Sequence, residues 1–266
     1  MRTSVILNLK GGVAKTSTAV NVAAILAHDY RQRVLLVDAD SQCNSTEFFG
    51  GDPSRGNLAD VLRYPSEDIG AFAAGSIQPG SFPGVDLLAG DEALMDLDLT
   101  QARTDGVRTL ALREMLVHIR ACWPEEKCYD TILVDCPPAF NAASAAALTA
   151  ADDVVIPIKL DAFSLRGMAN LYRQVANMRQ INPRLRLAGC LPVMWYSSPK
   201  ILEAEATLRG SGIPVFPCIR RTDKVDDMTF AQDPLILSSP RSAACVDYRR
   251  FVQVWLRGVK GGEKRG

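Results

Sequence analysis

The feature that most constrains the fold lies near the N-terminus, where an apolar run leads through a glycine-containing loop into a helical pattern. Val5 to Leu9 is typical of a buried strand, and the helical pattern extends from Lys15 to about His28. The loop between them consists of Lys10, Gly11, Gly12, Val13, Ala14, Lys15, Thr16 and Ser17. Backbone N–H groups of such a loop, together with the N-terminus of the next helix, form a site for a phosphate group. The sequence therefore predicts a phosphate-binding loop, or P-loop, at residues 10–17.

Two side chains of this loop have the chemistry that a bound nucleotide requires. A lysine at the position of Lys15 contacts the β- and γ-phosphates of a nucleoside triphosphate, and a hydroxyl at the position of Thr16 binds Mg²⁺. A glycine pair that only makes a turn needs neither side chain. We therefore expect ATP and Mg²⁺ as cofactors, bound by the whole loop from Lys10 to Ser17.

Short apolar runs alternate with helical patterns along the rest of the chain. Further strands are expected at 34–37, 131–134, 154–158, 187–194 and 215–216, and helices at 142–151, 164–180, 199–209 and near the C-terminus. The apolar runs are continuous rather than alternating, which is typical of parallel strands covered on both faces. This order predicts an α/β fold, a doubly wound, mostly parallel sheet flanked by helices, as a single P-loop NTPase domain over residues 1–266. Residues 50–90, rich in glycine and proline, are expected to form a surface excursion with one short helix near 58–64.

The charge balance limits how the protein attracts a partner. Lys and Arg number 30 and Asp and Glu number 30, so an attraction to nucleic acid or to a membrane must come from a local patch. The chain contains no apolar run of about 18 residues and no signal-peptide pattern. Its seven cysteines show no CxxC or Cys/His spacing, which favours reduced thiols in a cytosol over structural zinc.

The loop departs from the standard pattern G-x-x-x-x-G-K-[ST], because Asn8 and Ala14 occupy the two glycine positions. It fits K-G-G-x-x-K-[ST] instead, with an additional lysine at Lys10. In this it resembles the ParA/Soj/MinD family of deviant Walker ATPases, which position DNA cargo or cell-division proteins, and is most similar to the short Soj-type ParA proteins. The resemblance implies that Lys10 reaches the phosphates of the partner subunit in an ATP-bound dimer. Most members have glycine at the position of Ala14.

Two acidic segments extend the resemblance. Asp40, in the segment 34–42, matches the family's aspartate near the attacking water and the metal, although Ser41 and Cys43 replace the usual proline and glycine. Asp135, in the segment 131–138, resembles the Walker B aspartate at the tip of a buried strand, which holds Mg²⁺ through water. The implied catalytic residues are Lys10, Lys15 and Asp40, and the implied metal ligands are Thr16, Asp40 and Asp135.

The resemblance covers nearly the whole chain and includes the segments 150–158, 219–225 and 240–244. It implies that Met194 and Arg221 line the adenine pocket. It also implies that the dimer binds DNA without sequence preference, with Lys224 at the family's basic position in the late switch. A second family arginine falls near Ser198, where Lys200 is the nearest substitute. The expected DNA-binding residues are Lys224, Arg221, Arg220, Lys200 and Arg241.

The implied activity is slow ATP hydrolysis stimulated by a ParB-like centromere-binding partner, in a cytoplasmic, nucleoid-associated homodimer that drives plasmid or chromosome partition. The P-loop begins at Lys10, so a preceding helix-turn-helix domain and operator binding are not expected.

Four alternatives share parts of this pattern. A MinD-like protein would end in an amphipathic membrane helix, but the stripe Ala244, Tyr248, Phe251, Val252, Trp255 and Val259 favours a last helix docked on the sheet, so no stable membrane anchor is expected. A nitrogenase-type iron protein needs a second cysteine to accompany Cys136. A metabolic P-loop ligase resembling dethiobiotin synthetase would turn over a small carboxylic substrate. A regulatory ATPase of cellulose export, pilus assembly or a mobile element would share the ATPase site but carry other cargo.

Overall fold

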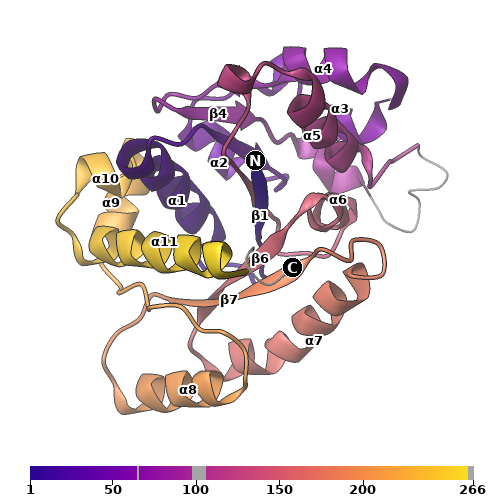
Figure 1. Ribbon diagram of the computed structural model, residues 1–266. Helices are drawn as coiled ribbons and strands as arrows, with labels where there is room; N and C mark the ends of the chain where they lie inside the picture. Colours follow the sequence, from indigo (N-terminus) through magenta and orange to yellow (C-terminus); the bar gives the residue numbers. More distant parts are fainter. Residues whose placement is uncertain (65, 98–105, 263–266) are drawn as a thin grey trace.

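The computed structural model describes residues 1–64, 66–97 and 106–262 (Figure 1). Within them, seven strands form one sheet in the order β3-β4-β2-β5-β1-β6-β7. The strands are β1 (Arg2–Ile6), β2 (Val34–Asp38), β3 (Gln78–Pro79), β4 (Val85–Leu88), β5 (Thr131–Asp135), β6 (Asp153–Lys159) and β7 (Arg186–Val193). All run parallel except β3, which pairs antiparallel with β4 at one edge. The predicted doubly wound, mostly parallel sheet is confirmed.

The first strand occupies a central place in this sheet. β1 lies between β5 and β6, so the chain winds toward β2 on one side and later toward β6 and β7 on the other. The register pairs Asp135 of β5 with Ile6 of β1 and with Asp38 of β2, so three strands end side by side. In open α/β sheets, ligands bind outside these carboxyl ends at the point where the winding direction reverses.

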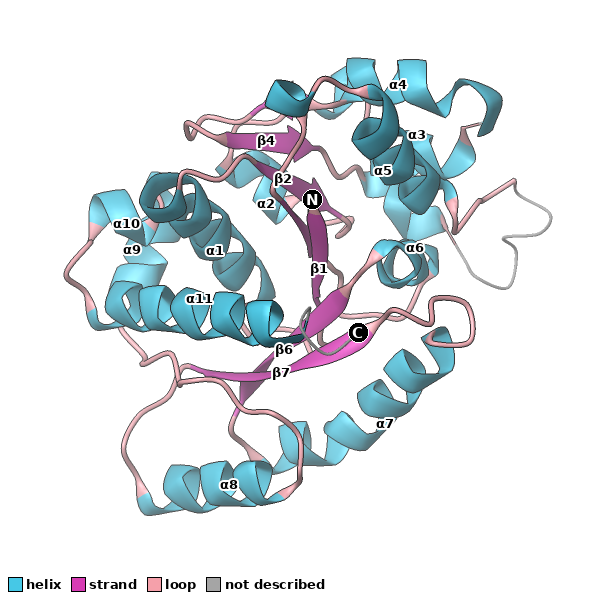
Figure 2. Cartoon of the chain, viewed as in Figure 1, coloured by secondary structure: helices cyan, strands magenta, loops and turns pink. Residues whose placement is uncertain are grey.

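Helices cover both faces of the sheet (Figures 1 and 2). One face carries α1 (Lys15–Tyr30), α9 (Lys224–Ala231), α10 (Leu235–Ser238) and α11 (Ala243–Gly262). The other carries α3 (Leu58–Arg63), α5 (Ala111–Cys122), α6 (Ala142–Ala150) and α7 (Ala162–Met178). The remaining helices are α2 (Asn44–Phe48), α4 (Ile69–Ser76) and α8 (Pro199–Gly210), with 3-10 turns at Pro53–Arg55, Ser66–Asp68, Glu92–Asp96 and Glu125–Lys127.

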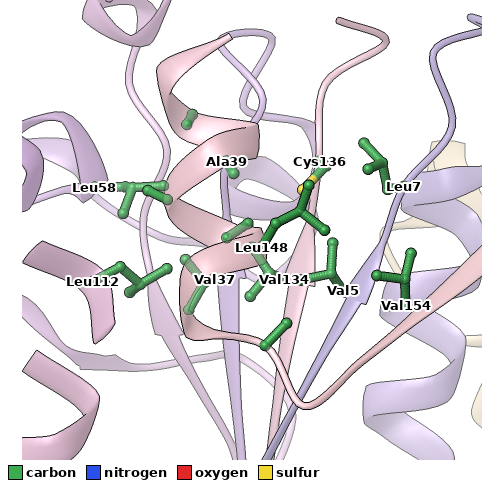
Figure 3. Close-up of a cluster of buried hydrophobic side chains, with 14 of the residues drawn as sticks. Val5, Leu7, Val37, Ala39, Leu58, Leu112, Val134, Cys136, Leu148 and Val154 are labelled. Atoms are coloured by element: carbon green, nitrogen blue, oxygen red, sulfur yellow. The ribbon is translucent and has the colours of Figure 1, made fainter. Parts of the chain in front are cut away.

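The sheet separates two apolar cores. Neighbouring residues of a strand point to opposite faces, so Val37 contributes to one core and Leu36 to the other. Figure 3 shows part of the first core, where Leu58, Leu112 and Leu148 of three helices lie beside the central strands. Burial on both faces explains why the strands are continuously apolar in sequence.

Two strand boundaries differ from the sequence prediction. The first strand ends at Ile6 rather than Leu9, because the Asn8 side chain bonds the Pro157 carbonyl (Nδ2 to O, 2.7 Å) and the Lys10 N–H (N to Oδ1, 3.0 Å), which turns the chain into the loop. The expected strand at 215–216 is only a bridge between Cys190 and Val215. Prolines at positions 214 and 217 flank it and have no N–H group for a ladder.

The prediction that residues 50–90 form a surface excursion is wrong. β4 pairs with β2 inside the sheet, and Leu58 and Leu62 of α3 are fully buried. The elements here are too short for their periodicity to distinguish a core segment from a loop. The many glycines and prolines mark turns between short elements of the core.

The last helix packs on the sheet, as the sequence favoured. Tyr248, Phe251, Val252 and Trp255 of α11 are buried in the second core. None of the helices in the described ranges is long and apolar enough to cross a membrane.

Candidate functional site

The P-loop has the backbone shape that its sequence pattern requires. Gly12 and Ala14 both adopt the left-handed region, with φ of 68° and 54°. Helix α1 begins at Lys15 directly after Ala14, and no side chain in the described part of the chain caps its N-terminus. An uncapped helix start leaves N–H groups that can bind an anion.

Lys15 is held inside this loop. Its side chain is buried, and Nζ donates to the Lys10 carbonyl at 3.3 Å. Burial lowers the pKa of Lys15 below its ordinary value, while the carboxylates of Asp135 and Asp40 oppose this shift. A desolvated cation thus lies beside two carboxylates at the carboxyl edge of the sheet.

Lys10 is half-exposed. Its Nζ forms an ion pair of 2.7 Å with Asp161, which follows β6. In this structure Lys10 and Lys15 therefore occupy different surroundings, one at the surface and one buried. The side chains of the two lysines predicted from the motif therefore have different partners: that of Lys15 bonds the Lys10 carbonyl, and that of Lys10 pairs with Asp161.

The Asp135 carboxyl group lies at the tip of β5 and is almost wholly buried. Oδ2 accepts a hydrogen bond of 2.6 Å from the Ser45 hydroxyl, whereas buried Oδ1 has no hydrogen-bond partner in the described residues. Burial raises the pKa of Asp135, and hydrogen bonds from Ser45 and Thr16 act in the opposite direction. The structure therefore brings Thr16 and Asp135 together, as the predicted metal site requires.

The segment 39–43 between β2 and α2, the switch, is held in place by a second carboxylate, that of Asp38, to which the sequence prediction gave no role. Asp38 Oδ2 accepts from the Thr46 N–H and the Thr46 hydroxyl, both at 2.8 Å, and that hydroxyl accepts from the Gly90 N–H at 2.8 Å. Burial and nearby Asp135 raise the pKa of Asp38. The sequence signal that could have indicated this role of Asp38 is the pair of aspartates, Asp38 and Asp40, at the end of a buried strand.

Asp40 lies two residues beyond Asp38 and is also buried. Its N–H donates to Asp38 Oδ1 at 3.2 Å, and its own Oδ1 accepts from the Gln42 N–H at 3.1 Å. Cys43 takes the left-handed conformation, with φ of 53°, that favours glycine. The switch thus turns tightly around Asp40 although Ser41 and Cys43 differ from the family pattern.

The donor set fits Mg²⁺ bound together with a nucleotide. Among the described residues, no group of three or more Asp, Glu, His or Cys side chains is arranged to hold a metal. Mg²⁺ commonly takes one or two carboxylates plus phosphate and water oxygens, so Thr16 and Asp135 are a sufficient protein contribution. All seven cysteines are free thiols, and Cys136 is buried, which gives no support to a bridging iron–sulfur cluster.

A cavity of about 340 Å³ opens beside the end of the P-loop. The residues that line it include Ala14, Met194, Arg220, Arg221, Val225 and Tyr248. Ligand cavities commonly range over roughly 300–1,000 Å³. The structure therefore places Met194 and Arg221, predicted to contact adenine, in one cavity next to the phosphate loop.

Comparisons with known proteins match this geometry. A family model described as an AAA domain matches residues 1–187. The chain is 35% identical over 209 residues to the chromosome partitioning protein ParA of Caulobacter vibrioides, covering 77% of this chain and 74% of that protein. It is 34% identical over 265 residues to the chromosome-partitioning ATPase Soj of Thermus thermophilus, covering 98% of this chain and 97% of that one. The chain belongs to the ParA/Soj family of partitioning ATPases.

The fold is also shared by a solved structure of a protein that is named as a synthase rather than as a partitioning protein. Cobyrinic acid a,c-diamide synthase from Mycobacterium smegmatis, solved with bound ADP and magnesium, has a TM-score of 0.78 and 28% sequence identity, and the match covers 98% of this chain and 96% of that one.

The basic residues predicted to bind DNA differ in their surroundings in this ParA/Soj chain. Lys224 begins α9 and pairs with Asp227 at 2.8 Å, and Arg220 pairs with Asp247 at 2.7 Å. Arg221 is exposed at the nucleotide cavity, and Lys200 and Arg241 are exposed on α8 and before α11. The hydroxyl of Ser198, at the position of the second family arginine, caps α8 by accepting from the Ile201 N–H at 3.3 Å.

Proposed function

We propose that this chain is a ParA-type partition ATPase that alternates between an ATP-bound dimer and separate subunits. Two copies enclose Mg-ATP, and the dimer binds DNA without sequence preference at the nucleoid. A ParB-like centromere-binding partner stimulates hydrolysis, which is slow without it, and thereby releases the dimer from DNA. The family membership supports this cycle, since relatives over nearly the whole chain are named as partitioning ATPases.

One observation supports the ATPase site above all others. Buried Lys15 and the unpartnered Oδ1 of Asp135 lie together at the carboxyl edge of the sheet, directly at the P-loop. A buried cation and a buried acceptor without a partner are costly unless a ligand compensates them. Mg-ATP supplies both the phosphate anion for Lys15 and the cation for Asp135.

The side chains divide the chemistry of hydrolysis. Lys15 and the loop N–H groups hold the phosphates, and Thr16 and Asp135 hold Mg²⁺, which neutralises charge on the phosphates when bound. Asp40 positions the attacking water, because it is held next to Lys15 by the tight switch turn. The exposed Lys10 exchanges its contact with Asp161 for the phosphates bound to the partner subunit.

The base and the DNA contact different residues in and near the segment 219–226. Met194 and Arg221 contact adenine in the cavity of about 340 Å³. Phosphate contacts come from four exposed residues, Lys224, Arg220, Arg241 and Lys200, of which Arg220 also lines this cavity. Lys224 and Arg220 must exchange their carboxylate partners for DNA phosphates, so each contact is weak in one subunit and dimerisation doubles their number.

The test is DNA binding by the purified protein with Mg-ATP, with Mg-ADP and without nucleotide, together with ATPase rates with and without DNA. We expect binding to random-sequence DNA only with ATP, and an affinity that falls linearly with salt on a log–log plot. Equal DNA affinity with ATP and ADP, or binding insensitive to salt, contradicts the proposal.

A small-molecule ligase is the second candidate, and one observation favours it. The similarity to the solved cobyrinic acid a,c-diamide synthase covers 98% of this chain at 28% identity. A ligase consumes ATP only when its carboxylic substrate is present and does not respond to DNA. ATP turnover that requires a small carboxylic acid and is unchanged by DNA supports this candidate over the partition ATPase.

A further inference from the structure

A buried asparagine connects the P-loop helix to the segment that bears the DNA residues. Asn21 lies in α1, one turn after Ser17, and its side chain is 1% exposed. Its Nδ2 donates to the Ser17 carbonyl at 2.7 Å and to Met228 Sδ at 3.1 Å. Its Oδ1 accepts from the N–H of Leu235 at 3.0 Å. One amide thus joins the first turn of the P-loop helix to α9 and to the start of α10.

The same segment contacts the nucleotide region at two other points. Val225 and Asp226, in the first turn of α9, line the cavity next to the P-loop. At the other end of α9, Gln232 Nε2 donates to Glu47 Oε1 of α2 at 3.2 Å, and α2 directly follows the switch that contains Asp40. Figure 1 shows α9 and α10 together beside α1. The segment from α9 to α10 therefore touches the P-loop helix, the cavity and the helix that follows the switch.

Packing alone does not account for an asparagine at this position. A buried polar side chain is costly unless it is hydrogen-bonded, and an apolar residue of similar size would fill the same space between α1 and α9. The amide adds a directional link, since its hydrogen bonds form only at one relative placement of the three helices. A shift of α1 by the width of one hydrogen bond must move or break the contacts to Met228 and Leu235.

We propose that Asn21 is a positioning residue that transmits the nucleotide state of the P-loop helix to α9 and α10, and so sets when Lys224 is placed for DNA. The inference rests on the proposed function for its consequence in DNA binding. Binding of phosphates at Lys15 and Thr16 fixes the first turn of α1, and Asn21 carries that placement to α9 through the Ser17 carbonyl and Met228.

The chain offers a matched control in Asn182. Asn182 follows α7 on the other face of the sheet; it is 5% exposed, and its Nδ2 donates to two carbonyls at the end of α6, those of Leu148 at 3.0 Å and Ala151 at 2.6 Å. Asn182→Leu removes a buried amide of the same kind without touching α1, α9 or α10. A general loss of stability is expected in both variants, Asn21→Leu and Asn182→Leu. A loss of transmission of the nucleotide state from α1 to α9 is expected only in Asn21→Leu.

The first measurement is amide hydrogen exchange over residues 224–231, with and without a non-hydrolysable Mg-ATP analogue. In the parent protein and in Asn182→Leu, we expect the analogue to slow exchange by about fivefold or more, the lower end of ordinary allosteric coupling. In Asn21→Leu, nucleotide affinity is retained, but the change falls to within about twofold. A parent-like response in Asn21→Leu, an equal loss in Asn182→Leu, or no response in the parent protein overturns the inference.

The second measurement compares DNA affinity with ATP and ADP for the same three proteins. We expect the ratio of the two affinities to fall toward one in Asn21→Leu only. If exchange in α9 responds as expected but the parent protein binds DNA equally with either nucleotide, the proposed function fails while the role of Asn21 stands. If the parent protein shows the DNA ratio and Asn21→Leu keeps it in full, the role of Asn21 fails instead.

Discussion

We expect single residues of the P-loop to decide whether a nucleotide binds, and Lys15 to contribute most to the affinity. Its buried ammonium group has the Lys10 carbonyl as its hydrogen-bond acceptor and lies beside the carboxylates of Asp135 and Asp40. We expect Lys15→Ala to lose at least about 100-fold in Mg-ATP affinity, since hydrogen bonds to charged groups contribute roughly 1.5–3 kcal/mol each. Titration with a fluorescent ATP analogue measures the loss.

Lys10→Ala is the control for that experiment. Because Lys10 is half-exposed and pairs with Asp161, its removal leaves the loop of one subunit intact, and we expect near-parent ATP affinity. Parent-like affinity in Lys15→Ala contradicts the assignment of the phosphate site.

Ala14 carries a backbone cost at the end of the P-loop. Its φ of 54° lies in the left-handed region, which costs a residue with a Cβ roughly 1–2 kcal/mol relative to glycine. We expect Ala14→Gly to raise the free energy of unfolding by about 1 kcal/mol, after the larger unfolded-state entropy of glycine is allowed for. Urea unfolding measures it.

Ala206→Gly in α8 is the control and should lower the free energy of unfolding, because this exposed helical alanine has no such strain. There we expect a loss of roughly 0.5–1 kcal/mol. A loss of stability in Ala14→Gly as well would show that the left-handed backbone at Ala14 carries no cost.

At the residue scale, the sequence predicted the local chemistry better than the contacts that support it. The loop and the carboxylates of Asp40 and Asp135 follow from motifs that lie next to strand ends. The roles of Asp38 and Thr46 do not, because the bond to Gly90 depends on how β4 is placed beside β2. Residues joined only by sheet register leave no periodic signal in one sequence.

The carboxylates at the ends of β2 and β5 make the free energy of unfolding depend on pH. Burial raises the pKa of both Asp38 and Asp135, so the folded state holds protons that the unfolded state releases above the ordinary carboxyl value of 3.8. Stability from these groups is fully present below that value and is lost as pH rises through the raised pKa.

Urea unfolding of the parent protein and of Asp135→Asn, without nucleotide, isolates this contribution. We expect the parent protein to lose about 1–3 kcal/mol relative to Asp135→Asn between the acidic range and neutrality. The exposed Asp226→Asn is the control and should follow the parent curve. Equal pH dependence in the parent protein and Asp135→Asn would contradict the raised pKa of Asp135.

We expect the proposed DNA binding to depend most on helix α9. Lys224 is exposed at its first position, and its ammonium group pairs with the neighbouring Asp227 at 2.8 Å, a surface contact that it can exchange for a phosphate. We expect Lys224→Ala to reduce the slope of log affinity against log salt by about one for each lost phosphate contact, with ATP binding unchanged.

Lys127→Ala is matched to it, because Lys127 is an exposed lysine in the turn before β5, far along the chain from α9. An unchanged salt slope in Lys224→Ala, or an equal change in Lys127→Ala, would remove α9 from the DNA surface.

At the scale of elements, the long helices and the central strands were predictable and the short elements were not. The helix predicted from Lys15 to about His28 is α1, which ends at Tyr30, because its apolar pattern persists over four turns. In contrast, β4 has four residues and α3 has six, so their burial depends on packing against β2 and α5. The bridge at Val215 shows the same limit, since flanking prolines prevented a full strand there.

In the proposed function, one edge of the sheet serves as the nucleotide site, the dimer interface and the DNA surface of the molecule. The P-loop, the switch around Asp40 and the tip of β5 meet there, and α1 and α9 extend from the same edge. Lys10 lies at the surface of this edge, where a second subunit can approach it. We therefore expect nucleotide binding and self-association to be one event.

Light scattering of the parent protein with a non-hydrolysable Mg-ATP analogue and with Mg-ADP measures whether nucleotide binding and self-association are coupled. We expect twice the mass of one chain with the analogue and the mass of one chain with ADP, and we expect Lys10→Ala to bind the analogue yet remain a single chain. An identical mass with both nucleotides, or a Lys10→Ala protein that doubles its mass as the parent protein does, would contradict a nucleotide-switched dimer.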